Sequence, residues 1–461
     1  MLNLYTTSQS EYIKKNLDKL AKAAAKQKLL LLEPTIDEYK KVMNIIKDYI
    51  RKKKRIIYGG YAINALLINK NKNEGIYDDD LDTPDIEFYT PDPINDLIEI
   101  CNELEDKKFK FVLGKSAQHK ETYSVFVNFE GYCDISYVPK IVYNNIPTIK
   151  IDGILMTHPK YVFIDRLREF TDPITSGWRW EKQFSRMALL QQYYPFKDES
   201  GKLHIQVDNK HKSVVQEILE KHIKGNDTLI LFNYFAYNYY IEKSRTNDFS
   251  KVDIPYLDII SINYVDDCKK LCDFMQKLYP NEIQTEEYYP FFQFYGYKFT
   301  IKFKDKLMIN VYDNNHKCVP YTKTEDDYNI VSFSYILLML LILQQRTIID
   351  KDKNKNENYN KMFSNLLIIR NKYLDTHNKT VIDDTPFKEF QVACKGTTLS
   401  QARLYRLDME KKRNERKRLA FYYHPNENRN KQKEDASKFL FKNTSGNLIR
   451  NPKNKKISSC K

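Results

Sequence analysis

The sequence lacks the cysteine motifs and the leader that mark several familiar protein classes. Its seven cysteines are odd in number and scattered, with no CxxC pair and no Cys/His spacing typical of a metal site. Cys268 and Cys272 lie four residues apart in an apparent amphipathic helix, where buried thiols are expected rather than ligands. Residues 1–10 lack a basic stretch followed by an apolar run, so no secretory signal is predicted. We therefore expect reduced cysteines and an intracellular protein.

Long apolar runs and glycine are also scarce. The longest run, Tyr335 to Leu343, is shorter than the roughly 20 residues that a membrane helix needs, and is predicted to be a buried core helix. Only 12 glycines stand against 35 tyrosines and 25 phenylalanines. Aromatic rings are therefore expected on surfaces and in grooves, where they can stack on bases.

What is present is the composition of a globular protein with a basic end. The 461 residues, 42% hydrophobic and 30% charged, are enough for two or three cores. The net charge of +14 is concentrated in residues 401–461, where 18 Lys and Arg stand against 6 Asp and Glu. Such a tail indicates either a polyanionic partner or a solvated extension.

The order of the predicted elements indicates a mixed α/β domain after a helical start. Helical spacing over about residues 9–54 breaks at Pro34 and predicts two helices. A strand at 56–58, a glycine turn, a helix at 61–67, a strand at 83–89 and a helix at 94–106 follow. Two strands, 123–129 and 132–138, are expected to form a hairpin that turns at Glu130-Gly131. Helices are predicted from His158 and near Trp178 to about 193.

Three carboxylates stand out in these strands. Asp85 and Glu87 alternate with apolar neighbours, so both side chains point to one face of the sheet. Asp134 is an acidic residue in an otherwise core-forming strand, which is costly unless metal or hydrogen bonds compensate it. Two divalent ions held by about three carboxylates are what nucleotidyl transfer requires. Asp82 is a rival for Asp85, but Pro84 separates it from the strand.

The glycine pair Gly59-Gly60 lies between a strand and a helix. It lets the backbone approach a phosphate, and the N-terminus of the next helix, with Asn64 on its first turns, favours an anion. Alone, the pair is more often a plain turn. Followed by the Asp-x-Glu strand and the isolated aspartate, it becomes specific.

With these residues the sequence resembles the DNA polymerase beta-like nucleotidyltransferases. Three segments resemble more narrowly the poly(A) polymerase catalytic subunits of large DNA viruses, the mimivirus-like group above all: 58–64, 83–89 and 132–137. The resemblance implies that Asp85, Glu87 and Asp134 bind two Mg²⁺ ions, that ATP is the donor and that an RNA 3′ hydroxyl is the acceptor. Mn²⁺ is a possible substitute, and Gly60 stands where the family usually has serine. A viral origin would imply the host cytoplasm and the virion as locations.

Further cations are candidates for binding phosphate. The resemblance makes Arg179 and Lys182, beside both tryptophans, candidate ligands of the ATP triphosphate, although both could be a solvated helix face. In the tail, a run of cations precedes Phe421-Tyr422-Tyr423, so phosphates could meet the cations and bases the rings. An ordinary charged helix or a nuclear address is the alternative. The candidate RNA-binding residues are Lys411, Lys412, Arg413, Arg416, Lys417 and Arg418.

The order of elements repeats once. Strands near 257–262, 297–303 and 307–312, with a helix ending near 278, echo the first domain. In this alignment Asp258 replaces Asp85, Ile260 replaces Glu87, and the strand around Asn310 replaces the one with Asp134, so two of three carboxylates are lost. Residues 350–361 have almost no apolar content and are predicted to be a solvated loop.

The prediction is an α+β chain with four parts. Residues 1–54 are N-terminal helices, 55–195 a catalytic nucleotidyltransferase domain, 196–400 a second nucleotidyltransferase-like domain without catalytic carboxylates, and 401–461 a basic tail. The predicted activity is polyadenylation of RNA 3′ ends by a two-metal mechanism, with a homodimer expected. Another RNA- or protein-directed nucleotidyltransferase, a non-catalytic RNA-binding protein of the same fold and a structural protein are the alternatives.

Overall fold

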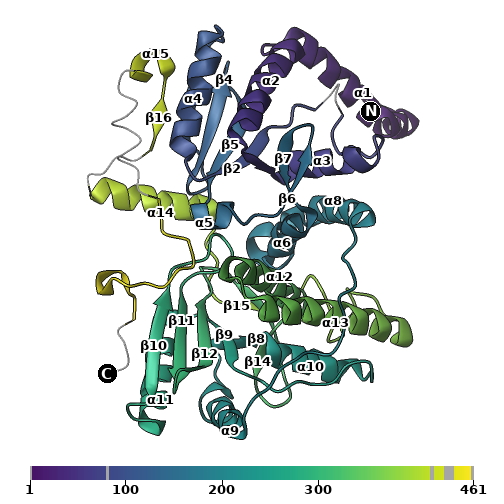
Figure 1. Cartoon of the computed structure of the whole chain (residues 1–461). Helices are drawn as coiled ribbons and strands as arrows, with labels where there is room; N and C mark the ends of the chain where they lie inside the picture. Colours follow the sequence, from purple (N-terminus) through teal and green to yellow (C-terminus); the bar gives the residue numbers. More distant parts are fainter. Residues whose placement is uncertain (1–2, 79–81, 416–419, 430–440, 458–461) are drawn as a thin grey trace. The chain divides into compact units, whose positions relative to one another are not determined.

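The computed structural model describes residues 3–78, 82–415, 420–429 and 441–457 (Figure 1). The chain divides into two compact units. The first comprises residues 1–137, 148–158 and 405–441, and the second comprises 138–147, 159–404 and 442–461. The helices at 159–193, which the sequence groups with the catalytic domain, cluster with the second unit.

The first unit is built on a mixed sheet of eight strands in the described residues. Its central pair, β2 and β5, is parallel, and β2 also pairs with the antiparallel β1. From one edge to the other the order is β16 (Tyr422–Tyr423), β3 (Leu113–Ser116), β4 (Thr122–Val127), β5 (Glu130–Tyr137), β2 (Ile86–Thr90), β1 (Ile56–Tyr58), β7 (Ile154–Thr157) and β6 (Thr148–Ile151). The helices of this unit are α1 (Thr7–Leu31), α2 (Ile36–Lys53), α3 (Gly59–Lys70), α4 (Pro93–Asp106) and α15 (Pro425–Asn428).

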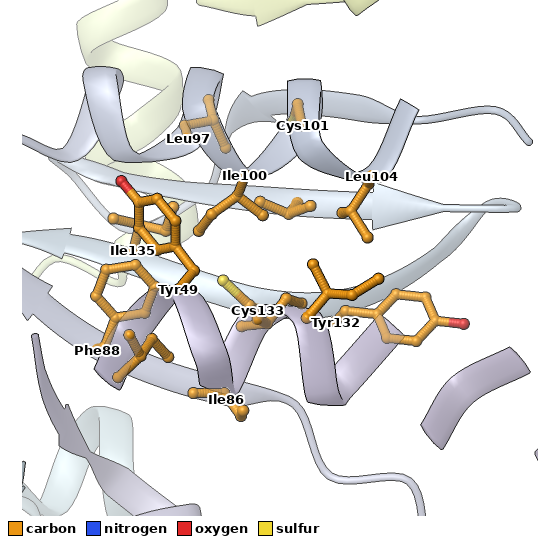
Figure 2. Close-up of a cluster of buried hydrophobic side chains, with 14 of the residues drawn as sticks. Tyr49, Ile86, Phe88, Leu97, Ile100, Cys101, Leu104, Tyr132, Cys133 and Ile135 are labelled. Carbon is orange, nitrogen blue, oxygen red and sulfur yellow. The ribbon is translucent and has the colours of Figure 1, made fainter. Parts of the chain in front are cut away.

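One face of this sheet forms the hydrophobic core. Period-two alternation sends Ile86 and Phe88 of β2, and Cys133 and Ile135 of β5, to the same side. There they pack against the apolar stripes of α2 and α4, which Figure 2 shows on that face. Burial of such side chains contributes roughly 25 cal/mol per Å² of apolar surface. The opposite face of the same strands is left for polar groups.

The two predicted N-terminal helices are confirmed. Thr6 caps α1, and its capping box with Gln9 satisfies two backbone N–H groups. Thr35, directly after Pro34, caps α2, whose Val42, Ile46 and other apolar residues are buried. By contrast, α1 has no buried residue along its described length.

The hairpin turns two residues earlier than predicted. Asn128 and Phe129 both have positive φ, at 50° and 68°, and form the two-residue turn. Glu130 and Gly131 instead begin β5. The Glu-Gly pair suggested the turn because glycine favours positive φ, but Asn supplied it here.

The second unit contains another mixed sheet, again of eight strands among the described residues. Its order is β10 (Ile283–Tyr288), β11 (Lys298–Phe303), β12 (Lys306–Asp313), β9 (Leu257–Ser261), β8 (Leu229–Phe232), β14 (Asn329–Val331), β13 (Val319–Lys323) and β15 (Cys394–Lys395). The main helices of this unit are α6 (Pro159–Phe170), α8 (Trp180–Tyr193), α9 (Asn209–Ile218), α10 (Tyr234–Ser244), α11 (Tyr264–Leu278), α12 (Phe333–Asp350) and α13 (Lys353–His377). Shorter helices are α5 (Lys140–Tyr143), α7 (Pro173–Ser176), η1 (Gly177–Arg179), η2 (Leu219–Ile223) and η4 (Pro452–Asn454), while α14 (Gln401–Asn414) spans the boundary between the two ranges.

Seven strands of the two sheets match in order and direction, which confirms the duplication. The run β3-β4-β5-β2-β1-β7-β6 corresponds to β10-β11-β12-β9-β8-β14-β13. In both runs the third and fourth strands are parallel, as are the fifth and sixth, and every other pair is antiparallel. The connecting helices also correspond, α3 with α10 and α4 with α11.

Helix α12 is a core helix, as predicted. Its length and apolar composition would allow it to cross a membrane, but 72% of the helix is buried inside the fold. The loop predicted at 350–361 is wrong over most of its length, because α13 begins at Lys353. Asp352 caps this helix, and the Glu357–Lys361 pair supports its first turns, so a polar sequence stays helical there.

The prediction that all cysteines are reduced is wrong. Cys318, directly before β13, and Cys394 of its partner strand β15 are 76 residues apart and form a disulfide. Cys272 is disulfide-bonded as well, whereas Cys268, Cys101 and Cys133 are free and buried. Only pairing in the folded chain brings Cys318 and Cys394 together, and sequence spacing carries no sign of it.

The basic tail is not simply a solvated extension. Tyr422 and Tyr423 form β16 on the edge strand β3. Phe421 and Tyr423 are buried in the core of the first unit, so these two rings cannot stack on bases as predicted. Tyr422 is the exposed ring of the three.

Candidate functional site

The polar face of the first sheet gathers the candidate catalytic groups. It is the face opposite the core of Figure 2, and alternation along four adjacent strands brings small polar and acidic side chains to it. The residues on it are Tyr58 of β1, Glu87 and Tyr89 of β2, Asp134 and Ser136 of β5, and Thr122 and Ser124 of β4.

Glu87 and Asp134 lie directly opposite each other. They are register partners in the parallel pair β2 and β5, so both carboxylates project from neighbouring positions of one face. Asp85 precedes β2 by one residue and is exposed at its start. Its charge acts on Asp134, so all three predicted carboxylates belong to one end of these strands.

Asp134 is held in an environment that disfavours its charge. Burial raises the pKa of its carboxyl above the ordinary value, and the nearby charge of Asp85 adds to the increase. A hydrogen bond from the Ser124 hydroxyl, 2.5 Å from Asp134 Oδ1, and the charge of His119 oppose it. A cation between Asp134 and Asp85 would relieve this repulsion.

The glycine pair is built into the same site. Gly59 begins α3 with φ +71°, a conformation that favours glycine. A Cβ at this position would lie 1.7 Å from Oε2 of Glu87, so any side chain here would force the Glu87 carboxylate to move. The N–H of Gly60 donates to that oxygen at 3.3 Å. The N-terminus of α3 therefore meets the carboxylate face, where it can also meet an anion.

A hydroxyl network fixes the strands below these groups. Tyr58 Oη lies 2.8 Å from Ser136 Oγ, which lies 3.0 Å from Thr122 Oγ1. The ring of Tyr58 stacks on Tyr89 with a centroid distance of 3.8 Å and an interplanar angle of 3°. These contacts tie β1, β2, β5 and β4 together on the functional face.

The donor set suits a hard divalent cation, although the side chains are not arranged around one. Among the residues that the structure describes, no three His, Cys, Asp or Glu side chains are close enough to hold a metal ion. The Glu87 carboxylate accepts a hydrogen bond from the Gly60 N–H. Carboxylate oxygens at a partly exposed sheet face, one of them destabilised by burial and repulsion, are the ligands that Mg²⁺ and Mn²⁺ prefer.

The other predicted ATP ligands lie in different surroundings. Asn64 Oδ1 accepts a hydrogen bond from the Ile76 N–H at 2.8 Å, so this side chain holds the segment after α3. Arg179 lies in the second unit. Its guanidinium carbon is 5.6 Å from the centroid of the Trp178 ring, and its Nη1 is 3.8 Å from Glu169 Oε1. Lys182 is exposed on α8 of the same unit. Their role in binding ATP stays a prediction.

Half of the predicted RNA-binding residues lie on α14. Lys411 and Arg413 are exposed there, while Lys412 forms an ion pair with Asp408 at 2.9 Å. Arg416, Lys417 and Arg418 lie outside the described residues.

The duplicated sheet shows what replaces the site in the second unit. Strand register makes Asp258 the equivalent of Glu87, because Asp258 pairs with Phe232 and Asn310 as Glu87 pairs with Tyr58 and Asp134. The predicted match of Asp258 with Asp85, and of Ile260 with Glu87, is therefore wrong by two residues. Tyr256 occupies the place of Asp85, so one carboxylate of three is still retained.

The equivalent of Gly59 is Asn233, and its side chain closes the second site. Asn233 has φ +54° and follows β8 as Gly59 follows β1. Its amide donates to Asp258 Oδ2 at 2.5 Å, and the Asn310 amide donates to Oδ1 at 2.9 Å. Asp258 is 2% exposed, and burial raises its pKa. The carboxylate is thus satisfied by two amides of the protein and is shielded from solvent.

Asp258→Ala is expected to destabilise the chain rather than to impair its chemistry. Removing the carboxylate leaves the amides of Asn233 and Asn310 without their acceptor in the core, which costs about 3 kcal/mol of unfolding free energy. Denaturant unfolding measures this, with exposed Asp266→Ala as the control. Lost activity in a variant of unchanged stability would contradict a purely structural role.

Sequence reasoning missed the hydroxyl groups of the site. Thr122 and Ser124 alternate with Tyr123 and Val125 in a strand of the core. That alternation was the available signal, since two small hydroxyls on the face of Asp134 indicate a polar site rather than a core. Tyr58 directly precedes the glycine pair, and its three-residue strand is too short for a periodicity that would assign the side chain to the polar face.

Comparison with known proteins gives consistent matches over nearly the whole chain. Residues 44–176 match the family "Poly(A) polymerase catalytic subunit", and residues 188–458 match the family "APMV, Putative poly(A) polymerase, catalytic subunit, C-terminal". The "Putative poly(A) polymerase catalytic subunit" of Acanthamoeba polyphaga mimivirus is 39% identical over 97% of this chain and 84% of its own length. The protein of the same name from African swine fever virus (strain Badajoz 1971 Vero-adapted) is 30% identical over 34% of each chain.

A solved structure agrees with these matches. The crystal structure of the Megavirus polyadenylate synthase superposes with a TM-score of 0.93 at 39% identity, over 98% of this chain and 94% of that one. The similarity therefore includes both sheets and the C-terminal segment.

Proposed function

This chain belongs to the poly(A) polymerase catalytic subunits of large DNA viruses, and on that premise we propose that Asp85, Glu87 and Asp134 carry out its transfer of adenylate from ATP to RNA. It is a nucleotidyltransferase that polyadenylates RNA, a family activity that uses ATP and divalent metal. The observation that supports the proposed site is the meeting of Gly59, Glu87 and Asp134 on one polar face.

The reaction joins the RNA 3′ oxygen to the α-phosphorus of ATP. The bond between that phosphorus and the bridging oxygen to the β-phosphate breaks, so pyrophosphate leaves. When bound, two Mg²⁺ ions would supply the charge that favours the alkoxide and neutralises the phosphates, and Asp85, Glu87 and Asp134 would hold them. Mn²⁺ is the alternative ion.

The remaining groups position the substrates. Gly59 lets the Glu87 carboxylate approach the backbone because it has no side chain, and the N–H groups at the start of α3 favour the polyphosphate. The Tyr58, Ser136 and Thr122 hydroxyls hold the strands in register. We assign this chemistry to the predicted domain 55–195, and RNA binding in part to Lys411, Lys412 and Arg413. The host cytoplasm and the virion are the proposed locations.

Extension of a labelled RNA primer tests the assignment. Each nucleoside triphosphate is supplied separately with Mg²⁺, and the wild type is compared with Asp85→Ala plus Glu87→Ala. Long tails from ATP, lost in the double variant, are the expected result. Equal extension with another nucleotide would contradict ATP as the donor, and an active double variant would contradict the metal site.

We also propose that the chain forms a homodimer. Helix α1 has no buried residue and exposes Leu17, Leu20 and Leu31, and the tail is basic, so the chain brings its own surfaces for assembly and for RNA. Sedimentation at micromolar concentration is expected to give twice the mass of 55.0 kDa. A single monomeric species at that concentration would overturn this proposal.

A further inference from the structure

Residues 442–457, which belong to the last described segment of the chain, lie along the second sheet. The Tyr289 N–H donates to Asn447 O at 2.9 Å, and the Ile449 N–H donates to Glu287 O at 2.8 Å. Ile457 is buried, and the Glu287 carboxylate accepts a hydrogen bond from the Lys456 N–H at 2.8 Å. These contacts hold the segment in place beside the end of β10.

A hollow of about 570 Å³ lies between this segment and Tyr289. That volume falls within the usual range for small-molecule sites, roughly 300–1,000 Å³. Its lining contains one aromatic ring, one aliphatic side chain, three amides and one guanidinium. The residues are Tyr289, Leu448, Asn443, Asn447, Asn451 and Arg450.

The polar groups of this hollow differ in how far the protein already satisfies them. Asn443 Oδ1 accepts hydrogen bonds from the N–H and the hydroxyl of Ser445, and Asn451 Oδ1 accepts one from the Lys453 N–H. These two side chains therefore stabilise the fold of the segment. The exposed Asn447 amide and Arg450 guanidinium have no hydrogen-bond or ion-pair partner within the described part of the chain. Both are thus available to a ligand.

The charged side chains of residues 442–457 are all of one sign. Residues 442–457 contain Lys442, Arg450, Lys453, Lys455 and Lys456 and no Asp or Glu. A polyanion is therefore the complementary partner. An acidic peptide would meet the charge but would leave the ring and the amides unused, whereas a nucleotide uses all three kinds of group.

We propose that this hollow binds one nucleotide of single-stranded RNA, with adenine as the preferred base. The base stacks on the ring of Tyr289, the Asn447 amide pairs with the adenine N6 and N7 edge, and Arg450 binds the adjoining phosphate. An amide matches that edge because it offers one acceptor and one donor side by side. The proposal rests on RNA being the substrate of this chain, and it adds a contact in the second unit.

Binding of labelled oligonucleotides tests the proposal without any catalysis. Fluorescence anisotropy in EDTA, without nucleotide, compares rA15 with rU15, and free ATP serves as competitor. Tyr289→Leu and Asn447→Ala are each expected to weaken rA15 binding about tenfold, since base stacking and amide pairing contribute on that scale. Tyr289→Phe keeps the ring and is expected to bind as the wild type does, although it loses the bond to Asn454.

Matched control variants distinguish RNA binding in the hollow from general electrostatic attraction to a basic surface. Arg450→Gln is compared with Arg245→Gln, an exposed arginine elsewhere in the second unit. Weaker binding in Arg450→Gln alone supports the site. Equal loss in both arginine variants, unchanged binding in Tyr289→Leu and Asn447→Ala, or equal affinity for rA15 and rU15 would overturn it.

The source of the ligand and the proposed function are tested separately. Competition by free ATP at low micromolar concentration would overturn an RNA strand as the occupant in favour of a free nucleotide. Because the assay contains no metal, pocket binding is measurable even in a chain that extends no primer. Normal primer extension with no effect of the pocket variants on affinity would overturn the pocket and leave the proposed function intact.

Discussion

Asp134→Asn is expected to lower the rate of RNA extension at least about 1,000-fold. The substitution keeps the shape of the side chain and an oxygen that can accept from Ser124, but removes the negative charge opposite Glu87. A metal ion between the strands would lose one of its charged ligands, and the transferring phosphate would lose part of its neutralisation. Single-turnover extension of a labelled primer at saturating ATP and Mg²⁺ measures the effect.

The stability of this variant supplies the control. Burial raises the pKa of Asp134 in the folded chain, so the folded state binds this proton more readily than the unfolded state does. The folded state therefore loses stability as the pH rises from the ordinary pKa of an aspartate to the raised pKa of Asp134. At pH 7 in EDTA, Asp134→Asn is expected to melt at the same temperature as the wild type or above it. A lower melting temperature would attribute lost activity to unfolding, and full activity would remove Asp134 from the metal site.

Gly59→Ala is expected to reduce extension about 100-fold or more, because a misplacement of about 1 Å at a reacting site has effects of that size. The new Cβ would need the space of Glu87 Oε2, 1.7 Å away, at a φ of +71° that alanine rarely adopts. Glu87 must then move, and with it the approach of phosphate to the start of α3. The measurement is the apparent affinity for ATP together with the extension rate.

A second glycine makes the comparison specific. A methyl group on Gly177 would meet no atom of the described residues within 4 Å, and the φ of Gly177 is −54°, so Gly177→Ala is expected to be neutral. Similar losses in both variants would indicate a general effect of added methyl groups. Normal ATP affinity in Gly59→Ala would argue that phosphate does not approach this turn.

The elements that hold the carboxylates could be predicted because their signals are local. Alternation sets the faces of β2 and β5, and a glycine pair before an apolar helix marks the start of α3. The register of the duplicated sheet could not be predicted in the same way. Tyr256, Asp258 and Ile260 all point to the same face, so a period of two cannot choose among them, and only pairing with Asn310 does.

Contacts between distant segments account for the remaining misses. Strand β16 is two residues long, too short for any periodicity, and the Cys318–Cys394 bond joins residues 76 positions apart. The polar start of α13 is helical through its cap at Asp352 and its buried Tyr359, which composition alone does not reveal. Each of these features depends on packing that a single stretch of sequence does not contain.

The ends of the two sheets have a consequence for synthesis of the chain. Strands β3 and β10 hold equivalent places in the duplicated order, and late segments cover both: Tyr422–Tyr423 on β3, and bridges at Ser445 and Leu448 beside β10. Neither edge is closed until the ribosome has made nearly the entire polypeptide. During translation both nascent sheets carry an open edge, a state prone to intermolecular strand pairing. A fragment ending near residue 400 would keep that state permanently.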